Sequence, residues 1–71
     1  MKLHYYPETD SLYIDLAAKT SAESLEVADG VVVDFDAAGN VVGIDIEHAS
    51  KKLDLGVLET EALPTRKLKL G

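Results

Sequence analysis

VVVDFDAAGNVVGIDI, residues 31–46, is the stretch of sequence that decides the fold. Its two ends alternate apolar and polar side chains, as half-buried strands do, and its middle, residues 36–40, is rich in turn-forming residues. The stretch therefore predicts an antiparallel hairpin between residues 31–36 and 41–47. The hairpin pairs Phe35 with Val42, Val33 with Ile44 and Val31 with Ile46, so that these apolar side chains share one face.

Two neighbouring connections extend the same apolar face. A three-residue loop, Ala28-Asp29-Gly30, joins a strand over residues 23–27 to the hairpin, and Gly30 adopts a left-handed conformation there at little cost. The turn Pro7-Glu8-Thr9-Asp10 joins two more strands, over residues 2–6 and 12–17. These connections pair Leu25 with Val33, Val27 with Val31, Tyr5 with Leu12, and Leu3 with Ile14.

The segments together predict an α+β fold. We expect a small antiparallel sheet of four to five strands in meander order, covered on its apolar face by a short C-terminal helix. The helix is predicted over residues 48–55, where Gly56 ends it, and a further helical turn is predicted over residues 57–63. Residues 1–63 then form a single domain, and residues 64–71 form a basic tail or an edge strand.

Composition excludes several classes of protein. The chain has 71 residues, enough for one small domain. It has no Cys, which excludes disulfides, thiol nucleophiles and cysteine-ligated zinc. The longest apolar runs are only a few residues, so no segment is predicted to span a membrane. No apolar stretch follows Met1 as it would in a signal peptide, and we expect a cytoplasmic protein.

The small size of the chain favours assembly. A chain of this length is expected to bury about 60% of its unfolded surface, for a hydrophobic gain of about 90 to 100 kcal/mol. Ordering its residues costs about 100 kcal/mol, so the two nearly cancel. With no disulfide to stabilise it, we expect the protein to be a homodimer or a larger homo-oligomer.

The charge is unevenly distributed. The chain carries 13 acidic and 7 basic residues, for a net charge of -6, and the bases concentrate after residue 50. This charge repels phosphate, so direct nucleic-acid binding is not expected, whereas a small basic protein is a suitable partner. A basic tail could dock on the acidic sheet, in cis or across a dimer, or be a frayed terminus. The tail residues predicted at an interface are Arg66, Lys67, Leu68, Lys69 and Leu70.

The polar face of the sheet has two kinds of candidate site residue. At one end, His4, Tyr6 and Tyr13 lie side by side in the predicted register, a combination enriched at subunit interfaces. At the other end lie four carboxylates that could hold a divalent cation, or that simply keep the face soluble: Asp34, Asp36, Asp45 and Glu47. An exposed sheet offers little burial to raise a carboxyl pKa, so we expect no enzyme chemistry, no catalytic residue and no cofactor.

Four pieces of the sequence resemble the signature of one family. They are YPETDSLYI at residues 6–14, VDFD at 33–36, GNVVGIDI at 39–46 and AS at 49–50. Together they resemble the small prokaryotic family catalogued as domain of unknown function 2283, over about residues 4–53. Pro7 departs from the signature where an acid is common, and Asp45 departs from it where Glu is common.

The resemblance implies a small cytoplasmic protein, and some members lie beside genes for toxins. We therefore expect a non-enzymatic protein-interaction module, an antitoxin-like partner of a small basic protein. The alternative is a small module that binds a divalent metal or another ligand through the four carboxylates.

Overall fold

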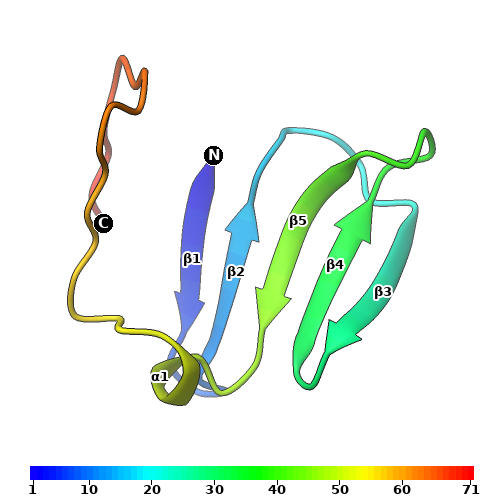
Figure 1. Cartoon of the computed structure of the whole chain (residues 1–71), viewed down its shortest axis with the longest axis horizontal. Coiled ribbons are helices and arrows are strands. Elements are labelled where there is room, and N and C mark those ends of the chain that lie inside the picture. Colours follow the sequence, from blue (N-terminus) through cyan, green and yellow to red (C-terminus); the bar gives the residue numbers. More distant parts are fainter.

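The computed structural model describes residues 1–71, which form a five-stranded antiparallel sheet and one short helix near the C-terminus (Figure 1). Each predicted strand is present within two residues of its expected bounds. The elements are β1 (Lys2–Tyr6), β2 (Ser11–Asp15), β3 (Glu23–Ala28), β4 (Val31–Phe35), β5 (Val41–Ile46) and α1 (Ala49–Lys52).

The strand order is β1-β2-β5-β4-β3, so the predicted meander order is wrong. The connection from β2 to β3 runs past the ends of β5 and β4, and β2 pairs with β5 instead of β3 (Figure 1). The physical reason lies in the side chains that meet, because this order places Leu12 opposite Ile46 and Ile14 opposite Ile44. The strongly apolar β5 thereby becomes the central strand, with a partner on each side.

The predicted hairpin registers are confirmed except near two turns. Tyr5 faces Leu12, Leu3 faces Ile14, Leu25 faces Val33, Val33 faces Ile44, and Val31 faces Ile46, all as expected. The predicted pairings of Val27 with Val31 and of Phe35 with Val42 are wrong, because the register shifts beside each turn. Val31 pairs with Ala28 and Phe35 with Val41. Each shift leaves one extra residue on one strand, as in a β-bulge.

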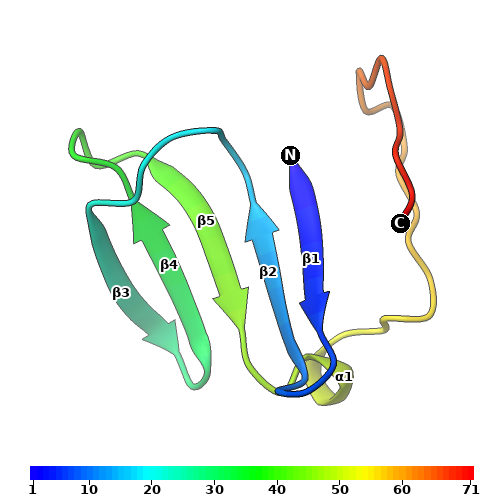
Figure 2. The same ribbon diagram turned by 180° about the vertical axis from the view of Figure 1, so that it is seen from behind.

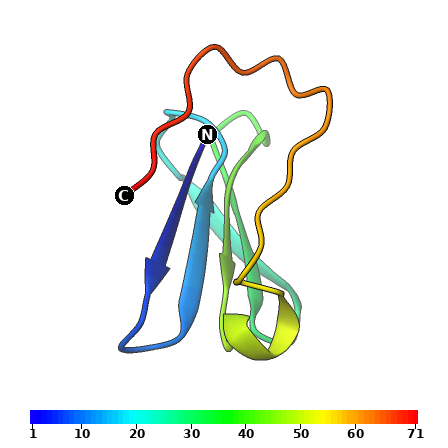
Figure 3. The same cartoon turned by 90° about the vertical axis from the view of Figure 1, so that its left-hand side faces the viewer.

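The helix is shorter than predicted and lies at one end of the sheet. α1 comprises four residues instead of the expected span 48–55, because Leu53 already has an extended backbone with φ -128° and ψ 152°. The Ala49 N–H donates to the Asp10 carbonyl and so ties α1 to the turn between β1 and β2. α1 lies at the lower end of the sheet in Figure 3, so the predicted helical cover of the apolar face is not confirmed. Residues 57–71 contain neither helix nor strand, and they run beyond the edge of β1 (Figures 1 and 2).

The sheet has one apolar face, here called the inner face. Along the strands, alternation assigns to it Leu3, Tyr5, Leu12, Ile14, Glu23, Leu25, Val27, Val31, Val33, Phe35, Val42, Ile44 and Ile46. In the whole chain, Leu12, Val42 and Ala49 are the only buried hydrophobic residues. Next to β1 and β2 the inner face forms one wall of an apolar groove of about 640 Å³, and residues 53–58 form the other.

No helix of this fold is long and apolar enough to cross a membrane.

Candidate functional site

The opposite surface of the sheet, here called the outer face, carries the polar and charged side chains. Its polar and charged members by alternation are Lys2, His4, Tyr6, Ser11, Tyr13, Asp15, Ser24, Glu26, Asp34 and Asp45, and Val32 lies on the same face. The register places Lys2 opposite Asp15, and Tyr13 lies between His4 on β1 and Asp45 on β5. Carboxylates outnumber the single Lys on this face, so the face is acidic as the sequence predicted.

Tyr13 is fixed in place by contacts that reach across the sheet. Its ring lies over Gly43 of β5, where an added Cβ would overlap the Tyr13 hydroxyl oxygen and lie 2.6 Å from Cζ. The hydroxyl donates a hydrogen bond of 2.8 Å to Oδ2 of Asp34, and the Ser24 hydroxyl donates one of 2.6 Å to Oδ1. Asp34, together with burial and the nearby charges of Asp15 and Asp45, raises the pKa of Tyr13 to about 12. This contact chain spans β2, β5, β4 and β3.

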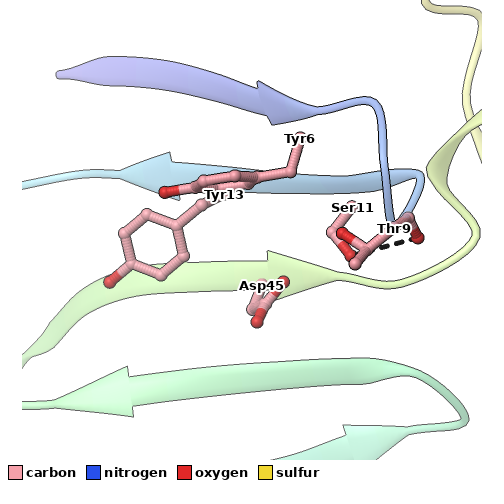
Figure 4. Close-up of a pocket in the computed structure, with 5 residues that line it drawn as sticks. All are labelled: Tyr6, Thr9, Ser11, Tyr13 and Asp45. Atoms are coloured by element: carbon pink, nitrogen blue, oxygen red, sulfur yellow. Dashed lines mark hydrogen bonds between the residues drawn. The ribbon is translucent and has the colours of Figure 1, made fainter.

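A shallow depression lies on the outer face beside Tyr13. It has a volume of about 420 Å³ and is lined by Tyr6, Thr9, Ser11, Tyr13 and Asp45 (Figure 4). The His4 ring packs against Tyr6, with 4.3 Å between centroids and 42° between planes. The three predicted aromatic residues are therefore neighbours. Aromatic faces beside a carboxylate and two hydroxyl groups suit a cationic group such as a Lys or Arg side chain.

Two of the four metal candidates are engaged by donors of the protein itself. Asp34 accepts hydrogen bonds from Tyr13 and Ser24. Asp36 closes the turn between β4 and β5, because its Oδ1 accepts the backbone N–H groups of Ala38 and Asn40, each at 2.9 Å. These bonds, chiefly those from Asn40, lower the pKa of Asp36.

The other two metal candidates lie elsewhere. Asp45 borders the depression, and Glu47 follows β5, where its backbone N–H donates to the carbonyl of Gly30. In this structure no group of three or more His, Cys, Asp or Glu side chains is placed to hold a metal ion. The four carboxylates are thus dispersed along the strands and turns.

The basic tail residues do not meet the outer face. Residues 66–70 are all exposed and follow an irregular path beyond β1 (Figures 1 and 2). The only ion pair of the chain joins Lys19, in the connection between β2 and β3, to Asp36, in the turn after β4, with 3.9 Å between Nζ and Oδ2.

Sequence reasoning missed a polar cluster that holds α1 against the turn between β1 and β2. The Asp10 carboxylate accepts hydrogen bonds from the Ser50 hydroxyl at 2.7 Å, the Ser50 N–H at 3.1 Å and the Tyr5 hydroxyl at 2.7 Å. Its backbone carbonyl accepts the N–H of Ala49. Ser50 and then Tyr5 lower the pKa of Asp10, while Asp10 raises the pKa of Tyr5.

This cluster explains why two distant pieces of the signature occur together. Asp10 lies in the first piece and Ala49-Ser50 in the last, and the structure brings them into contact. The presence of both pieces in one signature was the only sequence evidence for this contact, although the sequence alone does not say which residues meet. Because the Asp10 carboxylate accepts three hydrogen bonds within the cluster, we assign the cluster a structural role.

Comparison with known proteins supports the family suggested by the signature. The chain is 39% identical over 51 residues to an uncharacterized protein of Methanocaldococcus jannaschii, a match that covers 72% of this chain and 43% of that protein. The chain therefore spans less than half the length of this relative. No solved structure matches the chain. The model of the family described as protein of unknown function (DUF2283) matches residues 2–50. Since that match covers the whole sheet and the start of α1, the chain belongs to this family.

Proposed function

We propose that the protein is a non-enzymatic interaction module whose outer face binds a small basic protein, as an antitoxin binds a toxin. The observation that carries the proposal is the depression between Tyr6, Tyr13 and Asp45 on a face rich in carboxylates. A Lys or Arg side chain of the partner would enter it, with its charge beside Asp45 and its stem along the Tyr rings.

The energetics suit such an anchor. A cation over an exposed aromatic ring gains about 0.5–1 kcal/mol, and a neighbouring carboxylate adds a modest charge interaction. The Tyr13 ring is already held over Gly43 by its bond to Asp34, so little side-chain freedom is lost when a partner binds. The surrounding carboxylates attract a basic protein at a distance, which speeds association at low salt.

Two carboxyl groups of the chain are unsuited to act as a general acid at neutral pH. Both carboxyl groups with a shifted pKa, Asp10 and Asp36, are shifted downward by the hydrogen bonds they accept. A general acid at neutral pH requires the opposite shift. The proposal assigns these two carboxyl groups a structural role. It also places the protein in the cytoplasm, together with its partner.

The proposal predicts that a small basic protein is encoded beside the gene, and the test is a calorimetric titration of the full chain with that protein. Two variants are matched in charge, Asp45→Asn in the depression and Glu59→Gln in the exposed C-terminal segment. We expect Asp45→Asn to weaken binding about fivefold, as for an exposed charge pair, and Tyr6→Ala to weaken it by a similar factor. Glu59→Gln should change the affinity by less than about twofold.

Two results would contradict the proposal. One is a neighbouring basic protein that does not bind. The other is equal weakening by Asp45→Asn and Glu59→Gln, which would mean that only the overall charge matters.

A further inference from the structure

We infer that two copies of this chain pack inner face against inner face, forming a two-layer sandwich with an acidic outer face on each side. This inference goes beyond the proposed function, because it concerns the opposite surface of the sheet. It also names the occupant of that surface, a second copy of the same chain.

The inner face is uncovered in the single chain. Its edge strands leave Leu3 45% exposed, Tyr5 41%, Leu25 57% and Val27 55%, although alternation assigns all four to the side where a core should be. Leu12 and Val42 are the only strand residues assigned to this face that are buried. A sheet with one apolar face normally buries that face against another layer.

The total surface is too large for a complete folded unit. A compact monomer of 7.6 kDa exposes about 4,300 Å², whereas this chain exposes 5806 Å². The excess is about 1,500 Å², and a stable interface needs about 800 Å² from each partner. The radius of gyration of 13.0 Å also exceeds the value of about 11 Å expected for this length. The extended C-terminal segment, residues 57–71, is exposed throughout and contributes to both values. The exposed side chains of the inner face, among them Leu3, Leu25 and Val27, contribute to the surface as well.

The chain itself supplies no second layer. α1 has four residues, and residues 53–58 reach only the part of the inner face formed by β1 and β2, where they line the groove. The half formed by β3, β4 and β5 has no segment over it, since the remaining C-terminal residues run beyond β1 (Figures 1 and 2). We assign the cover of this half to a second copy of the chain.

A second copy fits this requirement in shape and charge. Two sheets pack face to face about 10 Å apart, and a two-fold axis lets the same apolar surface serve both partners. Apart from Glu23 at the end of β3, the strand positions on this face are apolar. The packing also turns the two acidic faces away from each other, which limits repulsion between copies that each carry a charge of -6.

The test measures solution mass by light scattering over a range of micromolar concentrations. Leu25→Lys and Glu26→Gln change adjacent residues of β3 on opposite faces, and each makes the net charge less negative by one. We expect the native chain and Glu26→Gln to have twice the chain mass of 7.6 kDa. Leu25→Lys should raise the dimer dissociation constant at least about 30-fold, because each copy loses a buried leucine and buries an ammonium group.

Two further measurements keep the inference testable if Leu25→Lys does not fold. Leu68→Lys makes the same change in the C-terminal segment and should leave the mass unchanged. The melting temperature of the native chain should rise with protein concentration, as it does when folding is coupled to dimerisation. The inference would be overturned if the native chain had the solution mass of one copy and a melting temperature that does not depend on protein concentration. So would dissociation by Leu68→Lys or Glu26→Gln equal to that by Leu25→Lys.

Discussion

Replacing Gly43 by Ala puts a methyl group where the ring of Tyr13 lies. The added Cβ would overlap the Tyr13 hydroxyl oxygen and lie 2.6 Å from Cζ and 3.3 Å from Cε1. The ring cannot stay over β5, so it must swing outward and give up its hydrogen bond to Asp34. The same movement would remove one wall of the depression that we propose as the partner's anchor point.

Two opposing effects set the size of the destabilisation. Inserting a carbon into an occupied position costs about 1–3 kcal/mol, and a lost hydrogen bond to a charged group adds to this. Alanine restricts the unfolded chain more than glycine does, which returns about 0.4–1 kcal/mol, and Gly43 is not among the left-handed glycines. We therefore expect Gly43→Ala to lower the free energy of unfolding by about 1–3 kcal/mol.

Urea denaturation measures this change, and titration of the tyrosinate absorbance reports its cause. The pKa of Tyr13, about 12 in the native chain, should fall toward its ordinary value of 10.0 in the variant, because Asp34 no longer holds the hydroxyl. Gly56→Ala is the matched control, since a Cβ there meets only the end of the Asp54 side chain at 3.4 Å. The reasoning is refuted if Gly43→Ala is as stable as Gly56→Ala and Tyr13 keeps its raised pKa.

Further predictions concern the polar clusters. Asp10→Asn should lower the melting temperature and speed amide hydrogen exchange at Ser50 about tenfold, because it weakens the hydrogen bonds that hold α1. An exchange rate at Ser50 equal to that in a Ser21→Ala control would contradict this. Because Asp10 and Asp36 have lowered pKa values, their stabilisation is present above the ordinary value of 3.8 and is lost as the pH falls below it, which an acid denaturation series at constant salt measures. Tyr13 has a raised pKa, so its stabilisation is complete below pH 10.0 and is lost as the pH rises toward about 12; alkaline unfolding of Tyr13→Phe should show a weaker loss. Calorimetric titration with Ca²⁺, Mg²⁺, Mn²⁺ and Zn²⁺ should give no saturable heat of binding, because protein donors already occupy two of the four candidate carboxylates. Saturable binding that Asp45→Asn abolishes would instead support the metal-binding alternative.

The hairpins could be predicted because their information is local. Turn residues and alternating apolar side chains fix which residues face each other, and the pairs Tyr5 with Leu12 and Val33 with Ile44 follow from them. The bulges were missed because a one-residue shift next to a turn leaves the rest of the apolar pattern intact. Adjacent apolar residues, as at Val41-Val42, allow either register near the turn.

The strand order could not be predicted from local pattern, and this error concealed the contribution of β4 and β5 to the candidate site. The sequence does place His4, Tyr6 and Tyr13 together, because β1 and β2 are joined by a short turn. The contact between Tyr13 and Asp34 requires β2 to lie beside β5, a pairing between distant segments. The helix was overpredicted for a related reason. Residues 53–55 have helical spacing, but no second layer in the chain holds them in that conformation.

The connection between β2 and β3 divides the chain into two units, each with only short turns inside it. One unit is the hairpin of β1 and β2, the other comprises β3, β4 and β5, and their seam is the ladder between β2 and β5. Closing this seam is the step with the greatest loss of chain entropy, so it should limit the folding rate. Residues 18–21 of the connection are exposed and in neither helix nor strand. A chain cut there should reassemble from its two fragments, with the apolar pairs across the seam as the recognition surface.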